Sequence, residues 1–320
     1  MSLLSVKGLC KSFHAGSWSG KDHITRAVDD VSFDIEEGET LAIVGESGSG
    51  KSTTARIVMR LLAADAGRIA LMGEDITYLK GKAMRNMRKH MQMVFQDPFA
   101  SLNPRMRIVE TVGEGLRVHA PEMNAKQRRE RVIEVLEHCG TGVEALDRYP
   151  HQFSGGQRQR IGIARALAVS PRLLVLDEPV SALDVSVQAQ ILNLLSDLQN
   201  EQKLAYLFIS HDLSVIKQVA DRVAVMFAGR IVEQGNAEVI YASPKHPYTR
   251  ALLDARPVEH PAQRKKPTDI AVRSEETVAK SGCAFRLRCP YAQEDCEAFD
   301  GALSTDDHAF ACLHPLKAES

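Results

Sequence analysis

The feature that most constrains this chain is a glycine-rich segment, Gly45–Ser52, between an apolar run and a helical pattern. The run Thr40–Val44 is typical of a buried strand, and Lys51–Leu62 carries apolar residues at helical spacing. The segment fits the pattern G-x-x-x-x-G-K-[ST], in which glycines let successive backbone N–H groups turn toward one anion. A flexible glycine–serine turn is the plain alternative, but the strand–loop–helix order favours a phosphate-binding loop.

Two side chains of this loop predict what the phosphates belong to. Lys51 can reach the β- and γ-phosphates of a nucleotide, and the hydroxyl of Ser52 is a ligand for Mg²⁺. We therefore expect ATP with magnesium at this loop. The residues expected to contact it are Gly45, Ser47, Gly48, Ser49, Gly50, Lys51, Ser52 and Thr53.

A second candidate element is the apolar run Leu173–Leu176, which ends in two acids. Asp177, at the end of the strand, can hold Mg²⁺, and Glu178 can polarise or deprotonate the attacking water. Alone, the two acids could simply begin a loop or helix. After a phosphate-binding loop, they indicate nucleotide hydrolysis.

A third element, Ser154–Gln157, is a second helix start suited to an anion. Ser154 is a good N-cap, Gly155 and Gly156 allow close backbone approach, and the helix is expected over Gln157–Val169. An ordinary capped helix is the alternative.

Apolar strands alternate with helical patterns along much of the chain, which predicts an α/β core with a largely parallel sheet. The other expected strands are Arg172–Leu176, Leu204–Ile209 and Arg222–Phe227, and the helices between them are Val187–Leu198 and Leu213–Val219. Residues 106–148 carry helical charge patterns, for example over Ala125–Leu136, and no convincing strand, which indicates an inserted helical subdomain. Beyond Ala255 the composition changes: Pro257, Pro261 and Pro267, with mixed charge between them, indicate a linker.

The net charge and the lengths of the apolar runs limit the kinds of partner that the chain can have. The 320 residues include 40 Lys and Arg against 41 Asp and Glu, a net charge of −1, which argues against a nucleic-acid partner. No run approaches the roughly 18 apolar residues of a membrane span, and no signal peptide is visible. We expect a cytosolic chain, or one held at a membrane by other subunits.

The six cysteines divide into two groups. Cys10 and Cys139 stand alone and are expected to be small buried apolar residues. Cys283, Cys289, Cys296 and Cys312 cluster near the end, with five, six and fifteen residues between successive members. That spacing matches neither a zinc knuckle nor a ferredoxin run, so the residues alone indicate only a four-thiolate site.

Together, the three elements resemble the ATP-binding subunits of ABC transporters over about residues 3–255. The loop corresponds to Walker A, Leu173–Asp177 to Walker B, and Ser154–Gln157 to the family signature, with Phe153 where the family usually has Leu. By the same resemblance, Gln96 is the Q-loop glutamine that senses Mg²⁺ and the membrane subunits, and Asp184 belongs to the D-loop. His211 is the switch histidine that contacts the γ-phosphate; alone, a histidine after a strand would more often be structural.

Adenine is expected to stack on an aromatic side chain before the loop. The resemblance makes Phe13 the candidate, although the long stretch His14–Arg26 offers Trp18 instead, and Phe13 could equally be core. The expected catalytic set is Glu178, His211, Gln96 and Lys51. The expected Mg²⁺ ligands are Ser52, Gln96 and Asp177.

The resemblance implies a P-loop NTPase core of RecA-like type, mostly parallel, with an antiparallel β subdomain. It places an ABC nucleotide-binding domain at 1–255, with the helical subdomain at about 97–170, and a linker and cysteine-rich extension at 256–320. Two such domains pair head to tail, so that ATP lies between the Walker A loop of one and the signature of the other. We therefore expect a second ATPase subunit (a non-identical paralogue), two transmembrane permease subunits and, indirectly, an extracytoplasmic solute-binding protein. The chain would lie at the cytoplasmic face of the inner membrane.

Two further segments resemble the dipeptide/oligopeptide permease subgroup: Ser243–Leu253 and the cysteine-rich tail Gly282–Cys312. In that subgroup the four cysteines can hold a [4Fe–4S] cluster; zinc or no metal is the alternative. His308 and His314 are possible substitute ligands, or surface histidines. The resemblance favours import of peptides, with nickel, opines or glutathione open. The rival hypotheses are a non-transport ABC ATPase and a regulatory metal-binding module without turnover. A single phosphate loop argues against the first, and the intact Lys51, Asp177, Glu178 and His211 against the second.

Overall fold

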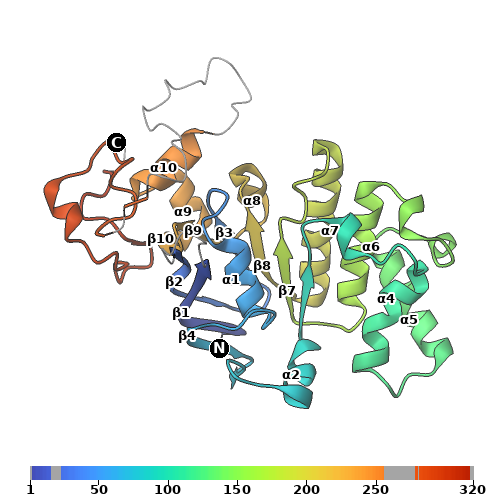
Figure 1. Cartoon of the computed structure of the whole chain (residues 1–320). Helices are drawn as coiled ribbons and strands as arrows, with labels where there is room; N and C mark the ends of the chain where they lie inside the picture. Colours follow the sequence, from blue (N-terminus) through green and yellow to red (C-terminus); the bar gives the residue numbers. More distant parts are fainter. Residues whose placement is uncertain (1, 16–22, 256–277, 280, 318–320) are drawn as a thin grey trace.

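The computed structural model describes residues 2–15, 23–255, 278–279 and 281–317. Trp18 and the expected linker prolines lie outside these residues. A central seven-stranded sheet organises the fold (Figure 1). Its strands, in spatial order, are β11 (Ala309–Phe310), β10 (Arg230–Asn236), β9 (Arg222–Phe227), β3 (Thr40–Val44), β8 (Ala205–Ser210), β7 (Leu173–Asp177) and β6 (Met91–Val94).

The pairs from β9 through β6 are all parallel, and β10 and β11 add antiparallel strands at one edge. A separate antiparallel sheet has the order β2-β1-β4-β5. Its strands are β1 (Leu4–Ala15), β2 (His23–Ile35), β4 (Ala66–Leu71) and β5 (Glu74–Asp75). The expectation of a mostly parallel sheet with antiparallel β structure beside it is confirmed.

Successive residues of the central strands are buried on opposite faces of the sheet. Ala42 and Val44 pack with the helices on one face, while Leu41 and Ile43 pack with α1 and the antiparallel sheet on the other. The same alternation divides β7 and β8. Because both faces are covered, the interior positions of these strands are apolar, and polar residues stand only at their ends, as at Thr40, Asp177 and Ser210.

Helices complete the two layers (Figure 1). They are α1 (Lys51–Val58), α2 (Gly81–Arg88), α3 (Pro98–Ser101), α4 (Ile108–His119), α5 (Ala125–His138), α6 (Gly155–Leu167), α7 (Val185–Gln202), α8 (Leu213–Val219), α9 (Ala237–Ala242) and α10 (Pro247–Asp254). Helix α6 packs against α3, α4 and α5, and the structure has no strand in residues 106–148, as expected. Helix α1 ends at Val58 rather than at the expected Leu62, because the backbone leaves the helix at Arg60, which has a positive φ of 54°. No helix in the described part of the chain is long and apolar enough to span a bilayer.

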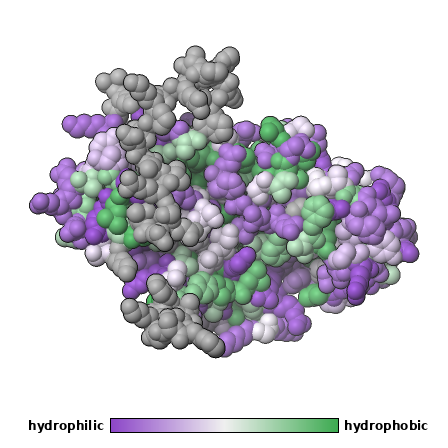
Figure 2. All heavy atoms as spheres, turned by 45° about the horizontal axis from the view of Figure 1, so that its top comes forward, coloured by the Kyte–Doolittle hydropathy of each residue, from purple (hydrophilic) through white to green (hydrophobic). Residues whose placement is uncertain are grey.

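Polar and apolar side chains alternate over the visible face in Figure 2. The end of the molecule that carries α4, α5 and α6 in Figure 1 is mainly hydrophilic there. Cys139, at the end of α5, is buried in the core as expected, whereas Cys10 is only half-buried. Its thiol lies 3.6 Å from the carbonyl of Gly8 and accepts the N–H of Asp30, so the expectation of a buried apolar Cys10 is wrong.

Residues 281–317, which we call the C-terminal segment, pack against the edge of the central sheet. Strand β11 pairs with β10, and the N–H of Ala311 donates to the carbonyl of Val232. Phe285 is 1% exposed and packs against Phe227, His246 and Tyr248. This aromatic cluster joins the segment to β9 and α10.

His246 makes this junction sensitive to pH. Its ring is 1% exposed, its Nδ1 accepts the N–H of Tyr248, and burial lowers its pKa to about 4. The ordinary value is 6.5, so the unfolded chain binds the extra proton between these values. Stability is therefore lost as the pH falls from 6.5 toward 4.

We predict that His246→Asn, which keeps an N-cap acceptor, removes this loss. Between pH 7 and pH 5, the free energy of unfolding in urea should fall by about 2 kcal/mol less in the variant than in the unchanged protein. Parallel pH profiles for the two proteins would contradict the prediction.

Candidate functional site

The phosphate-binding loop lies between β3 and α1, as predicted, and its shape requires glycine. Gly50 is the N-cap of α1 with a φ of 106°. A Cβ at this position would lie 2.2 Å from the carbonyl oxygen of Ala27. Backbone therefore packs directly on backbone at Gly50. The first N–H groups of α1, which follow it, have no acceptor within the helix and can donate to an anion.

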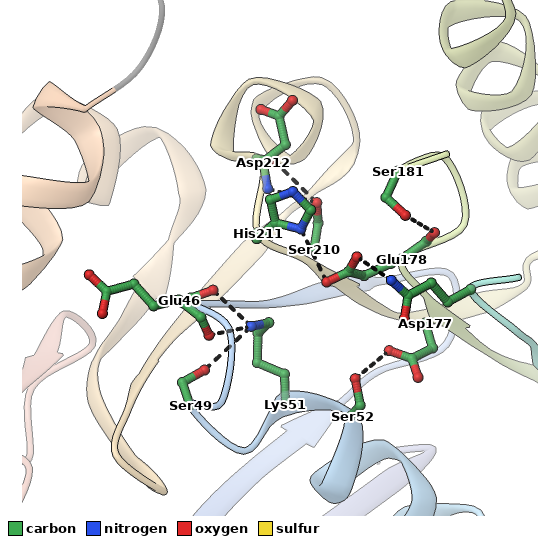
Figure 3. Close-up of polar contacts among 12 residues, drawn as sticks. Glu46, Ser49, Lys51, Ser52, Asp177, Glu178, Ser181, Ser210, His211 and Asp212 are labelled. Atoms are coloured by element: carbon green, nitrogen blue, oxygen red, sulfur yellow. Dashed lines mark hydrogen bonds and ion pairs between the residues drawn. The ribbon is translucent and has the colours of Figure 1, made fainter. Parts of the chain in front are cut away.

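Lys51 folds back onto the loop (Figure 3). Its Nζ donates to the carbonyls of Gly45 (2.8 Å) and Glu46 (2.7 Å), and lies 3.4 Å from the hydroxyl of Ser49. Burial lowers the pKa of Lys51, while the nearby carboxylates of Glu178, Asp177 and Glu46 oppose that shift. The ammonium thus holds the loop closed with donors that a phosphate could take over.

Ser52 and Asp177 meet at the base of the site. The hydroxyl of Ser52 donates to Oδ1 of Asp177 over 2.9 Å, and Asp177 is 3% exposed. Burial raises the pKa of Asp177 despite this hydrogen bond. A hydroxyl and a buried carboxylate form an oxygen pair of the kind that Mg²⁺ prefers.

Glu178 contacts two of the predicted residues, and Figure 3 shows the contact with His211. Its Oε2 accepts from Nε2 of Gln96 over 2.9 Å, and its Oε1 lies 3.1 Å from Nδ1 of His211. Glu178 also has a positive φ of 49°, and its N–H donates to the carbonyl of Ile209. The backbone is held in a left-handed conformation that aims the carboxylate between these neighbours.

All of these residues lie at one edge of the central sheet. Gln96, Glu178 and His211 follow the carboxyl ends of β6, β7 and β8, and the loop follows β3. Parallel strands bring their carboxyl ends together, so sequence order suffices to explain the gathering.

The signature residues do not join this group. Ser154 caps α6, and its hydroxyl and Gln157 form a reciprocal capping box. Gly155 and Gly156 lie in the first turn of α6, next to Leu183 and Val187. Figure 1 shows α6 well separated from α1, with β7 and β8 between them. Asp184 likewise acts as the N-cap of α7 and accepts the N–H of Val187.

The aromatic candidate Phe13 lies in β1 and is 43% exposed, so it is not a core residue. Lys11 lies 5.8 Å from the centre of its ring. An exposed ring on the antiparallel sheet remains available for stacking.

The four clustered cysteines are free thiols and line one small cavity in the C-terminal segment. Burial raises the pKa of Cys283 and Cys289, and raises that of Cys312 to about 11; interaction with neighbouring thiols acts in the same direction. His314 bonds to Asp295 (2.8 Å) and His308 to Glu233 (2.6 Å). Both histidines are partly exposed, and each is paired with a carboxylate.

One set of contacts was not predicted from the sequence. Arg288 of the C-terminal segment pairs with Glu46, and the hydroxyl of Tyr248 accepts the N–H of Glu46. No local pattern connects residues 242 positions apart.

Comparison with known proteins identifies the architecture. A family profile described as ABC transporter matches residues 28–181, and one described as oligopeptide/dipeptide transporter, C-terminal region, matches residues 232–296. A probable peptide ABC transporter ATP-binding protein of Sinorhizobium fredii, y4tS, is 47% identical over 316 residues, covering 97% of this chain and 89% of that protein. This chain belongs to the ABC transporter family.

Further ABC transporter relatives agree. The oligopeptide transport ATP-binding protein OppF of Escherichia coli is 47% identical over 292 residues, covering 90% of this chain and 87% of OppF. A dimeric structure of the ATP-binding cassette MJ0796, in a post-hydrolysis state with ADP and phosphate, has a TM-score of 0.66 at 29% identity. The match covers 73% of this chain and 98% of that one, and it supports the ABC ATPase fold with mixed sheet and helices.

The close packing at Gly50 generates a stability prediction for this ABC transporter chain. Gly50→Ala should lower the free energy of unfolding by at least about 3 kcal/mol, because the new Cβ must displace backbone. Gly38→Ala is the matched control: Gly38 also has a positive φ, 73°, but nothing lies within 4 Å of the added carbon. That variant should lose only about 1 kcal/mol in chemical denaturation. Equal losses would contradict the steric argument.

Proposed function

We propose that this chain is the ATP-hydrolysing subunit of an importer of dipeptides or oligopeptides. The observation that carries the proposal is Glu178, held by Gln96 and His211 at the same sheet edge as Lys51. The names of the relatives and the C-terminal match at residues 232–296 support a peptide solute. Importers of nickel, opines or glutathione and non-transport ABC ATPases are the alternatives.

In the proposed reaction, Lys51 exchanges the carbonyls of Gly45 and Glu46 for the β- and γ-phosphates of ATP. Ser52, Asp177 and Gln96 would hold Mg²⁺, which suits the oxygen donors present. When bound, Mg²⁺ neutralises phosphate charge. Phe13 is the proposed stacking partner of adenine.

Glu178 is the proposed general base that takes a proton from the attacking water. His211 orients the carboxylate of Glu178 and is the proposed contact of the γ-phosphate. Because these groups are already positioned by hydrogen bonds, little reorganisation is required during the reaction.

The remainder of the site is proposed to come from a second ATPase subunit, a non-identical paralogue. Ser154, Gly155, Gly156, Gln157 and Asp184 would face the nucleotide of that partner. Their distance from α1 in Figure 1 and the dimeric relative support this arrangement. Hydrolysis should accordingly be slow until the partner is present.

We further propose that the subunit binds two transmembrane permease subunits at the cytoplasmic face of the inner membrane, and serves an extracytoplasmic solute-binding protein through them. The nucleotide-binding domain is proposed to span residues 1–255, with its helical subdomain at about 97–170. Residues 256–320 would form the linker and the cysteine-rich extension.

The four thiols are the proposed ligands of a [4Fe–4S] cluster. They fit such a group, because all four line one cavity, and burial raises the pKa of three of them, Cys283, Cys289 and Cys312. A single zinc ion needs its sulfur ligands less than about 4 Å apart. Among the described residues, the candidate single-ion group within 4.8 Å is instead Asp295, Cys296 and His314. When bound, a cluster supplies a cationic iron core that stabilises thiolates.

We predict that Glu178→Gln retains Mg·ATP binding but loses hydrolysis by at least about 100-fold, because the general base is removed. The variant should also trap a closed dimer with its partner subunit, detectable by size-exclusion chromatography with ATP. Glu74→Gln, at an exposed position in β5, is the control and should hydrolyse normally. Unchanged turnover in Glu178→Gln would refute the role of the base.

We also predict that anaerobically purified protein is brown and contains iron and acid-labile sulfide in equal amounts. Cys289→Ser should lose both, while Cys10→Ser should keep both, because Cys10 lies in β1. Metal analysis that finds one zinc per chain and no iron would overturn the cluster.

A further inference from the structure

Arg288 and Glu46 form a two-pronged ion pair between the C-terminal segment and the phosphate-binding loop. One guanidinium nitrogen lies 2.9 Å from Oε2 and the other 2.7 Å from Oε1. The side chain of Arg288 is 6% exposed and that of Glu46 is 33% exposed. The rings of Phe227 and Phe285 lie 5.5 and 5.4 Å from the guanidinium and shield it from water. A shielded, bidentate pair is much stronger than an ordinary surface ion pair.

Glu46 is held at three points in all. Its N–H donates to the hydroxyl of Tyr248 over 2.9 Å, its carbonyl accepts from Lys51, and its carboxylate binds Arg288. Tyr248 is fully buried. The first half of the loop is therefore fixed from the C-terminal part of the chain, and Lys51 is the contact that ATP would replace.

The position of Arg288 depends in turn on the cysteines. A first turn, from Cys283 to Arg286, is closed by the N–H of Arg286 and the carbonyl of Cys283. A second turn contains Arg288 and is closed by the N–H of Cys289 and the carbonyl of Arg286. Arg288 immediately precedes Cys289, so a group bound to both thiols would fix the turn that carries the guanidinium.

We propose that Arg288 is a positioning residue for the phosphate-binding loop and that it couples the four-cysteine site to the nucleotide site. Occupation of the cysteine site strengthens ATP binding, and ATP strengthens occupation of the cysteine site by the same factor. The proposal rests on the proposed ATP site, and the coupling to the four-cysteine site also rests on the proposed metal group.

The charges of Glu46 and Arg288 determine whether the ion pair strengthens or weakens nucleotide binding. Glu46 places a carboxylate next to a loop that must accept a polyphosphate, and Arg288 neutralises it. Without Arg288, the carboxylate repels the phosphates and the loop loses one anchor. Both effects weaken nucleotide binding.

The test measures the dissociation constant of Mg·ATP for the full-length chain by titration calorimetry. Arg288→Gln should weaken binding about fivefold, the lower end of typical couplings. The double variant Glu46→Gln/Arg288→Gln should recover to within about twofold, because the unpaired charge is gone. Arg286→Gln is the matched control: it lies in the same turn but pairs with Glu297, away from the loop, and should bind normally.

An unchanged dissociation constant in Arg288→Gln, or a double variant as weak as the single one, would overturn the proposal. Arg288→Lys, which keeps the charge but not the fork, should fall between the unchanged protein and Arg288→Gln, and thermal unfolding identifies any variant that fails to fold. Lys51→Ala separates the two proposals, since an unchanged protein that binds no better than Lys51→Ala would refute the ATP site itself.

The coupling of the cysteine site to the nucleotide site is tested by Cys289→Ser alone and combined with Arg288→Gln. If the two residues act through one connection, the combined variant should bind Mg·ATP no more weakly than Arg288→Gln. Additive losses would overturn the coupling.

Discussion

The burial of the central sheet on both faces is the constraint on which the rest of the structure depends. Residues such as Leu41 and Ala42 are adjacent in the chain but belong to different cores. Parallel strands covered in this way must have their polar ends at the same edge. The groups proposed to carry the chemistry lie at that edge: Asp177 ends β7, Glu178 follows it, and the loop leaves β3. The geometry of the proposed site is therefore a consequence of sheet packing rather than an addition to it.

The same constraint explains which parts could be predicted from the sequence. The strands Thr40–Val44 and Arg222–Phe227 were predicted to the residue, because continuous apolar runs bounded by turns have few other interpretations. The antiparallel strands β1 and β2 were not, because shifts of register in their pairing interrupt the strict alternation of apolar and polar residues that marks a strand. Lys51 was predicted from the G-x-x-x-x-G-K-[ST] pattern, Glu178 from its place after an apolar run, and His211 from the family resemblance.

Contacts between distant segments were beyond prediction. Arg288 lies among cysteines and charged residues, and nothing near it in sequence indicates a partner at position 46. Likewise, the apolar character of Phe285 says that it is buried but not that it packs on Phe227. Such pairings depend on how the C-terminal segment docks at the sheet edge, which local propensity does not encode.

An acidic residue within a loop that binds polyphosphate needs a physical explanation, and Arg288 supplies one. An unpaired carboxylate at Glu46 would lower the positive potential that glycine N–H groups and the α1 N-terminus create. Paired with Arg288, the carboxylate of Glu46 instead anchors the loop to the C-terminal segment. In the proposed exchange, Lys51 leaves the carbonyl of Glu46 to bind ATP, and Glu46 stays fixed because Arg288 and Tyr248 also hold it. The site is thus kept in shape by the C-terminal segment during the exchange, and binding energy need not be spent on ordering the loop.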